Sequence, residues 1–157
     1  MEKQKVILVD VDGTIAKIDH RLYLIKKEPK DWEGFYDAAK EDEPLVDNIK
    51  MIKEALVELG ATPVFVTGRS DVIRDPTAAW IHKHFFGVTD PEKAKFLRLL
   101  FMRKAGDHRE DDVVKKEIYD GFTFYDVLRV YEDRPKVIRM YRELGVDVVD
   151  MGPGWDF

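Results

Sequence analysis

The chain has 157 residues, of which 45% are hydrophobic and 36% are charged, and its formal net charge is −5. That length predicts one domain with a substantial core. The acidic balance argues against a protein that coats long stretches of nucleic acid, but it permits recognition of one end or one nucleotide. The sequence contains no cysteine, which excludes disulfides, thiolate zinc sites and cysteine nucleophiles.

The sequence predicts neither a secretory signal nor a membrane span. The first apolar run, Val6 to Val9, is too short for a signal core, and Asp10 follows it directly. No run approaches the ~18 apolar residues that a spanning helix needs. We therefore expect a cytoplasmic protein without a membrane partner.

Apolar runs alternate with helical patterns along the chain. Runs without polar alternation are typical of strands buried on both faces of a parallel sheet, and they cover residues 6–9, 63–66, 99–102, 127–131 and 146–151. Helices are predicted over 45–59, 75–86, a short stretch from 91, 111–118 and 135–144, with N-caps at Asp75, Asp90 and either Asp111 or Asp112. The alternation predicts an α/β fold, a Rossmann-like parallel sheet with flanking helices.

We expect residues 1–157 to form a single domain with a small cap-like insertion after the first strand, at about residues 17–43. The insertion is rich in charge and carries three aromatic side chains, those of Trp32, Phe35 and Tyr36. Such side chains can stack on a nucleic-acid base. Aromatic residues in a small insertion more often pack its own core, which is the interpretation we favour.

Polar residues follow several of the predicted strands. Because parallel α/β sheets bind ligands outside the carboxyl ends of their strands, these residues are expected to form one site. They are Asp10 and Asp12 after the first strand, Thr67, Gly68 and Arg69 after the second, and Glu132 and Asp133 after the fourth.

The segment from Asp10 to Thr14 carries the most specific chemistry. Two carboxylates separated by one residue at a strand end can act as magnesium ligand, nucleophile or general acid. Magnesium prefers oxygen ligands and keeps water, so one or two carboxylates plus a substrate phosphate suffice, and Asp133 is placed to complete the set. Gly13 permits a tight turn whose amides can bind phosphate oxygens.

Cationic residues complete the pattern for phosphate chemistry. Arg69 can hold a phosphate in a bidentate fork. Lys115 or Lys116, on a predicted helix, can supply a cation to the charge that develops in the transition state.

These residues, in this order, resemble the haloacid dehalogenase superfamily of aspartate-nucleophile phosphotransferases. Its four motifs are matched by the Asp10–Thr14 segment, by Thr67, by a helical lysine and by the pair Glu132-Asp133. The resemblance implies a Rossmann-like sheet with strand order 3-2-1-4-5 and a required Mg²⁺ ion.

A closer resemblance is to the 3′-phosphatase domain of phage polynucleotide kinase, which removes 3′-phosphates from nucleic-acid ends and nucleotides. The matching residues are His20-Arg21, Thr67-Gly68-Arg69, the run from Asp107 to Lys115 and the terminal Gly154-Trp155-Asp156-Phe157. The run from Arg109 to Lys115 distinguishes this phosphatase domain from generic members of the superfamily, which lack it.

The resemblance implies a role for each matched residue. Asp10 would be the nucleophile, Asp12 the general acid and later the base, and Lys115 would neutralise the phosphate and hold Asp10. Mg²⁺ would be bound by Asp10, Asp133 and the main-chain carbonyl of Asp12. Substrate contacts would come from Arg21, Thr67, Gly68, Arg69 and Arg109, while Asp111 would orient a basic side chain of the site.

The sequence departs from this pattern at two points. Glu132 stands where an aspartate is more usual, so its direct role is open. No Gly-x-x-x-x-Gly-Lys-Ser/Thr loop occurs, and we therefore expect no kinase domain in this chain.

Three functions are compatible with this pattern. The first is a phosphatase for nucleic-acid 3′-phosphates or 3′-nucleotides, and the second is a phosphatase for another small substrate such as a 5′-nucleotide or sugar phosphate. The third is a non-catalytic module that binds phosphorylated ends, which would need no nucleophile. Both a monomer and a homodimer remain open, because Phe85-Phe86 and residues 96–102 suit either a core or a dimer surface.

Overall fold

The computed structural model describes residues 2–95 and 97–153. The terminal Gly154-Trp155-Asp156-Phe157, which matches the phage phosphatase domain in sequence, and Phe96 lie outside the described residues. Among the described helices, none has the length and apolar character needed to cross a membrane.

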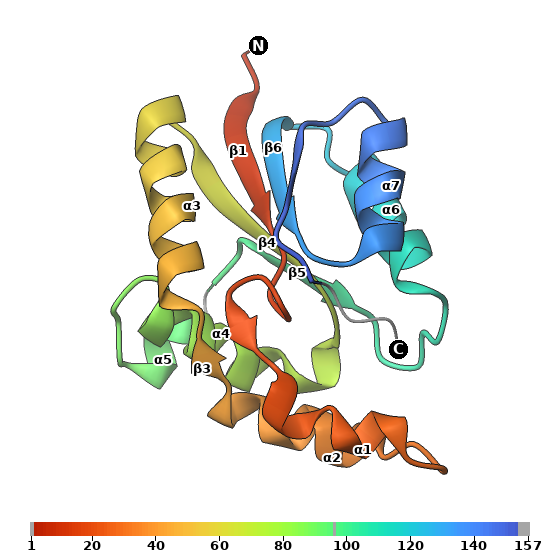
Figure 1. Ribbon diagram of the computed structural model, residues 1–157. Coiled ribbons are helices and arrows are strands. Elements are labelled where there is room, and N and C mark those ends of the chain that lie inside the picture. Colours follow the sequence, from red (N-terminus) through yellow and green to blue (C-terminus); the bar gives the residue numbers. More distant parts are fainter. Residues whose placement is uncertain (1, 96, 154–157) are drawn as a thin grey trace.

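A five-stranded parallel sheet forms the centre of the molecule (Figure 1). Its strands are β1 (Gln4–Val9), β4 (Thr62–Ser70), β5 (Leu100–Arg103), β6 (Tyr125–Glu132) and β7 (Val148–Asp150). They lie in the order β5-β4-β1-β6-β7, which is the 3-2-1-4-5 order implied by the resemblance to the haloacid dehalogenase superfamily. The predicted α/β class is therefore confirmed, and β1, at the centre, places Asp10 at the middle of the carboxyl edge.

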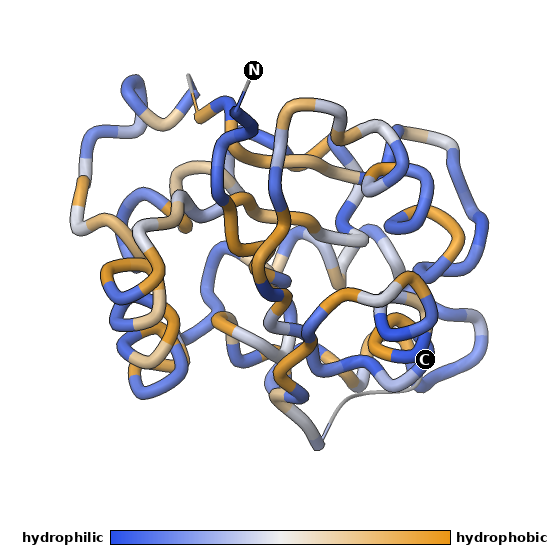
Figure 2. Tube along the Cα trace, turned by 90° about the horizontal axis from the view of Figure 1, so that it is seen from above, coloured by the Kyte–Doolittle hydropathy of each residue, from blue (hydrophilic) through white to orange (hydrophobic). Residues whose placement is uncertain are grey.

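Helices cover both faces of the sheet. On one face, α3 (Val46–Leu59), α4 (Arg74–His84) and α5 (Pro91–Ala94) pack Ile52, Trp80 and Ile81 against β1 and β4. On the other face lie α6 (Asp111–Asp120) and α7 (Pro135–Glu143), which bury Val137 and Tyr141. Hydrophobic residues run along the central strands, while hydrophilic residues gather on the outside (Figure 2).

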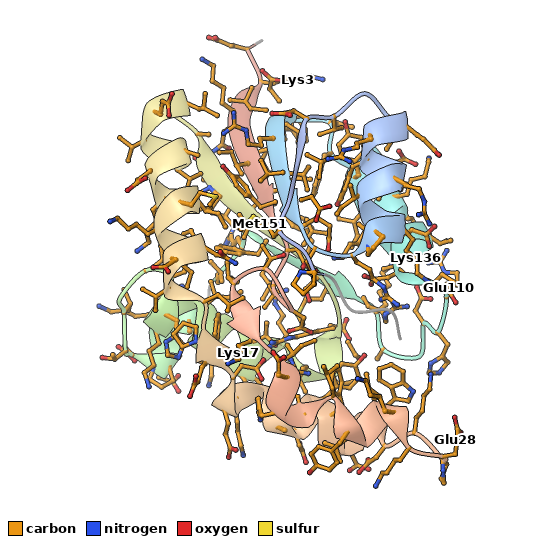
Figure 3. The ribbon with its side chains drawn as sticks, viewed as in Figure 1. Lys3, Lys17, Glu28, Glu110, Lys136 and Met151 are labelled. Carbon is orange, nitrogen blue, oxygen red and sulfur yellow. The ribbon has the colours of Figure 1, made fainter. Side chains whose placement is uncertain are left out.

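The chain between β1 and α3 extends beyond the carboxyl edge of the sheet. A short antiparallel pair, β2 (Ala16–Lys17) with β3 (Glu43–Pro44), forms its base. Beyond this pair lie α1 (Tyr23–Lys26) and α2 (Trp32–Asp37), flanked by 3-10 turns at Asp19–Arg21 and Ala38–Glu41. Figure 3 shows Lys17 near the start of this excursion and Glu28 at its tip.

This excursion, called the insertion below, has a small core of its own. Ile18, Leu22, Ile25 and Phe35 are buried together, and Tyr36 packs against them. Trp32 is 40% exposed at its surface. Phe35 and Tyr36 thus pack within the insertion, as the sequence interpretation favoured.

Two of the three predicted helix caps are wrong. Asp90 accepts a hydrogen bond from Glu92 N and precedes Pro91, as predicted. However, α4 begins at Arg74, so that Asp75 and Pro76 fall inside its first turn. The N-cap of α6 is Glu110, and Asp111 is already helical. The Asp111 carboxylate is instead engaged in the site described next.

Candidate active site

The turn after β1 places Asp10 against the end of β6. Gly13 has φ +84°, a left-handed conformation that disfavours residues with a Cβ. A Cβ at Gly13 would also lie 1.9 Å from Oδ2 of Asp133. Both the backbone conformation and the lack of space therefore require glycine at this position. Because glycine has no side chain, the Asp133 carboxylate can approach the turn.

Asp10 is held on both carboxylate oxygens. Lys115 Nζ donates to Oδ1 over 2.8 Å, and Thr14 Oγ1 donates to Oδ2 over 2.9 Å. Lys115 is buried in α6 and donates a second hydrogen bond of 2.8 Å to Glu132 Oε2. Burial alone would lower the pKa of Lys115, but Asp10, Glu132 and Asp111 outweigh it and raise that pKa well above its usual value. Lys116, by contrast, is exposed and paired with Asp120.

Three carboxylates gather beside this lysine. Asp10, Glu132 and Asp133 each offer an oxygen, and these oxygens lie within 4.8 Å of one another. Burial, followed by repulsion from Asp10, raises the pKa of Glu132 to about 8 and that of Asp133 to about 10. These three carboxylates are buried, repel one another and offer only oxygen ligands. Such a set fits a hard divalent cation such as Mg²⁺.

Glu132 differs from its two neighbours in this cluster. Its Oε2 accepts from Lys115, and its Oε1 accepts from the main-chain N–H groups of Asp133 and Arg134. With both oxygens engaged by protein donors, Glu132 is suited to orienting Lys115 rather than to binding a cation directly.

Asp12 faces away from this cluster toward two arginines. Its Oδ1 accepts from Arg69 Nη2 at 2.6 Å and Nε at 3.0 Å, and from Arg21 Nη2 at 2.9 Å. Burial raises the pKa of Asp12, but Arg69 and Arg21 outweigh it and bring that pKa to about 2. Both arginines thus engage Oδ1 of Asp12 and hold its carboxylate in the ionised form.

Asp111 sits among three basic side chains, Arg103, Lys115 and Arg134, at 3.3, 3.6 and 3.5 Å. Burial raises the pKa of Asp111, but these three cations together lower it below its usual range. Its approach depends on Gly68, where a Cβ would lie 2.0 Å from Asp111 Oδ1. Gly68 and Asp111 thus fit each other across β4 and α6.

A profile of the polynucleotide kinase phosphatase domain family matches residues 4–157. The chain belongs to this family. It is 31% identical over 147 residues to a protein of Autographa californica nuclear polyhedrosis virus whose name describes an inferred bifunctional polynucleotide kinase/RNA ligase. That alignment covers 92% of this chain but only 19% of the viral protein, so the shared segment is a small part of that relative.

Solved structures share the fold of this phosphatase domain. One chain of a Pnkp1/Rnl/Hen1 complex superposes with a TM-score of 0.71 at 25% identity, covering 99% of this chain and 48% of that one. The class C acid phosphatase of Bacillus anthracis with tungstate bound superposes with a TM-score of 0.60 at 14% identity, covering 96% of this chain and 67% of that one. The haloacid dehalogenase fold and a phosphoric monoester hydrolase activity follow from the family.

A pocket of about 460 Å³ opens beside the acidic cluster. Its floor includes Asp12, Thr67, Gly68 and Arg69. Its walls come from the insertion (Lys30, Trp32, Phe35 and Tyr36), from the last residue of β5 (Arg103) and from the loop that follows (Lys104, Gly106, Asp107, His108, Arg109 and Glu110). Figure 3 shows Glu110 beside Lys136, its ion-pair partner, at the outer side of that loop.

The fold brings most of the predicted site residues together, with two qualifications. Arg21 is fully buried behind Asp12 and is not among the residues that line the pocket. Arg109 lies at the pocket rim, where it is exposed and bonded to Asp107 and Glu117. Sequence reasoning gave no individual role to five residues that contact site residues: Asp42, Thr14, Thr77, Arg103 and Arg134.

Proposed function

We propose that this phosphatase domain transfers the phosphoryl group to Asp10, depends on Mg²⁺, and removes 3′-phosphates from nucleic-acid ends or 3′-nucleotides. The observation that carries the proposal is the position of Asp10, whose carboxylate is shared between Lys115 and the acidic cluster. A non-catalytic module that only binds phosphorylated ends does not need a buried carboxylate that is held in one orientation beside a candidate cation site.

Asp10, Asp133 and the main-chain carbonyl of Asp12 would hold the Mg²⁺ ion, while Glu132 orients Lys115. The bound cation would neutralise charge on the phosphate and so lower the barrier to attack by an anionic carboxylate. Lys115 supplies a second positive charge to the same region and holds Asp10 in one orientation.

The chain's own residues then perform two displacements. An Asp10 oxygen forms a bond to phosphorus, the ester O–P bond breaks, and Asp12 gives a proton to the departing hydroxyl. In the second displacement Asp12 takes a proton from water, whose oxygen attacks phosphorus and releases inorganic phosphate and free Asp10.

Asp12 is ionised in the free protein because its pKa is about 2. We propose that the proton for the leaving group enters with the substrate. A phosphate monoester, with a second pKa of about 6, can bind as the monoanion and pass that proton to Asp12. The phosphate also adds negative charge near Asp12, which raises the carboxyl pKa and favours the transfer.

Two observations support a nucleotide end as the substrate. The pocket volume of about 460 Å³ falls within the range of small-molecule sites and suits one terminal nucleotide. The relatives also include a protein whose name describes a polynucleotide kinase/RNA ligase. We propose that the insertion acts as a small cap, with Tyr36 and the half-exposed Trp32 facing the terminal nucleoside.

The deciding experiment is release of inorganic phosphate from matched 3′- and 5′-phosphorylated oligonucleotides and mononucleotides, with Mg²⁺ or with EDTA. We expect turnover of 3′-phosphates only with Mg²⁺ and no more than trace turnover by Asp10→Asn. Equal turnover of 5′-phosphates would remove the 3′ specificity while leaving the phosphatase chemistry in place. Full activity of Asp10→Asn would overturn the assignment of the nucleophile.

A further inference from the structure

The hydroxyl group of Tyr36 lines the pocket, but the proposed reaction does not use it. Tyr36 stands near the end of α2 and is only partly exposed. Within the part of the chain that the structure describes, this hydroxyl forms no hydrogen bond, and it is not enclosed by protein atoms. It is therefore available to a ligand in the pocket.

A short series of contacts connects the backbone beside Tyr36 to Asp12. The main-chain carbonyl of the preceding residue, Phe35, accepts a 3.3 Å hydrogen bond from Arg21 Nη1. Arg21 Nη2 in turn donates to Asp12 Oδ1 over 2.9 Å. The same guanidinium lies over the Phe35 ring, with Cζ 4.2 Å from the ring centre. A single arginine thus bridges α2 and the carboxylate that serves the leaving group.

The Tyr36 ring is held in place by the insertion. It packs against the small apolar core there, with its centroid 5.9 Å from that of Phe35 and 6.1 Å from that of Trp32. The start of the helix is fixed as well, because Asp31 accepts a 2.9 Å hydrogen bond from Gly34 N. A side chain that is ordered before binding loses less entropy when it contacts a ligand.

The surroundings of the Tyr36 hydroxyl keep it neutral. Burial raises the pKa of Tyr36 above its usual value, and the opposing charge of Arg103 does not offset this effect. The protonated phenol can both donate and accept a hydrogen bond, whereas a guanidinium only donates. Tyr36 is therefore suited to a neutral hydroxyl of the substrate, and the arginines are suited to phosphate oxygens.

Two other hydroxyl side chains line the described pocket, and both already have a role in the turn after β4. Thr67 is buried, and its Oγ1 accepts from Arg69 N over 3.2 Å. Ser70 Oγ accepts from Val72 N over 3.3 Å. Tyr36 differs from them because its hydroxyl has no protein partner and comes from the insertion.

In a 3′-phosphorylated ribonucleotide, the 2′-hydroxyl is on the carbon next to the one that carries the leaving oxygen. A group that contacts it must therefore lie close to Asp12, which protonates that oxygen. We propose that the Tyr36 hydroxyl binds this 2′-hydroxyl, a donor and acceptor like itself, and so favours ribonucleotide over deoxyribonucleotide ends. This inference rests on the proposed 3′-phosphatase function.

The test measures kcat/KM for phosphate release from two 3′-phosphorylated oligonucleotides of one sequence, which differ only in a terminal ribose or deoxyribose. Because a 2′-hydroxyl also changes the reactivity of the ester, the informative quantity is the change in the ribose-to-deoxyribose ratio on substitution. We expect Tyr36→Phe to lower this ratio by about tenfold, the worth of one ordinary hydrogen bond. For the deoxyribose end, kcat/KM should stay within about twofold of wild type.

Tyr23→Phe is the matched control, because Tyr23 is an exposed tyrosine of the same insertion that does not line the pocket. It should leave the ratio unchanged. An unchanged ratio in Tyr36→Phe, or equal losses on both ends, would overturn the proposal.

A measurement on the wild type alone keeps the test decisive even if Tyr36→Phe does not fold. A terminal 2′-fluoro sugar withdraws electrons as a 2′-hydroxyl does but cannot donate a hydrogen bond. We expect its kcat/KM to be about tenfold below that of the ribose end. Equal values would also overturn the role of Tyr36. Wild-type protein that releases phosphate from none of the three ends would instead refute the proposed function.

Discussion

Raising the pH without Mg²⁺ should destabilise the folded protein through its acidic cluster. The unfolded chain releases the Asp133 proton near pH 3.8, whereas burial and the neighbouring Asp10 keep that proton on the folded protein up to about pH 10. The folded state therefore binds more protons between these values. Stability attributable to this group is greatest at the acid end and falls as the pH rises.

The magnitude follows from one proton held over the whole interval. Each pH unit costs about 1.4 kcal/mol, so the step from pH 6 to pH 8 costs about 2.7 kcal/mol through Asp133. Glu132, whose pKa is raised to about 8, adds to the loss in the same direction. The lowered pKa of His84, caused by burial and then by Lys83, acts in the opposite direction.

Urea unfolding followed by tryptophan fluorescence at pH 6, 7 and 8 in EDTA measures this effect. Asp133→Asn is the matched control, because it removes the Asp133 titration and retains that of His84. We expect wild type to lose about 2.7 kcal/mol more than Asp133→Asn between pH 6 and pH 8. Mg²⁺ at a hundred times its Kd should stabilise wild type by about 2.7 kcal/mol. At a fixed Mg²⁺ concentration, this stabilisation should be larger at pH 8 than at pH 6. A wild-type stability in EDTA that is flat or rising relative to the control would refute the reasoning.

Three further outcomes are expected. Lys115→Met should lower the free energy of unfolding by about 3–5 kcal/mol in urea, because it strands buried carboxylates, whereas Lys116→Met should cost less than about 0.5 kcal/mol. Gly13→Ala should abolish phosphate release, while Gly60→Ala, with an equally left-handed backbone but open space at its Cβ, should lose only about 1–2 kcal/mol of stability and keep activity. Finally, kcat/KM should fall above pH ~6, and the fall should follow the second pKa of the substrate when different esters are compared, since Asp12 brings no proton of its own.

The sheet was predictable because its strands are continuous apolar runs, which only a sheet covered on both faces can bury. The strand ends then located Asp10 and Asp133 without any knowledge of side-chain contacts. The failed cap predictions have a local cause. A proline is tolerated anywhere in the first turn of a helix, so the pair Asp75-Pro76 marked the first turn of α4 but not its first residue.

Other features depend on contacts that no local pattern contains. Asp42 is one of several acids in a charged stretch, and its partners Arg21 and Arg69 lie 21 and 27 residues away. The choice between Lys115 and Lys116, in contrast, had an unused signal. Asp111 and Lys115 are four residues apart on one face of α6, so a functional Asp111 favours Lys115.

The charges of the buried ion-pair network bear on the proposed Mg²⁺ dependence. Six buried or nearly buried carboxylates meet five basic side chains there, which leaves one excess negative charge when all are ionised. The acids are Asp10, Asp12, Asp42, Asp111, Glu132 and Asp133, and the bases are Arg21, Arg69, Arg103, Lys115 and Arg134. Without a cation, Glu132 and Asp133 hold protons at neutral pH, because their pKa values are raised to about 8 and about 10. A bound divalent cation would displace these protons and place its positive charge beside the phosphate, so that phosphate binding and Mg²⁺ binding should each strengthen the other.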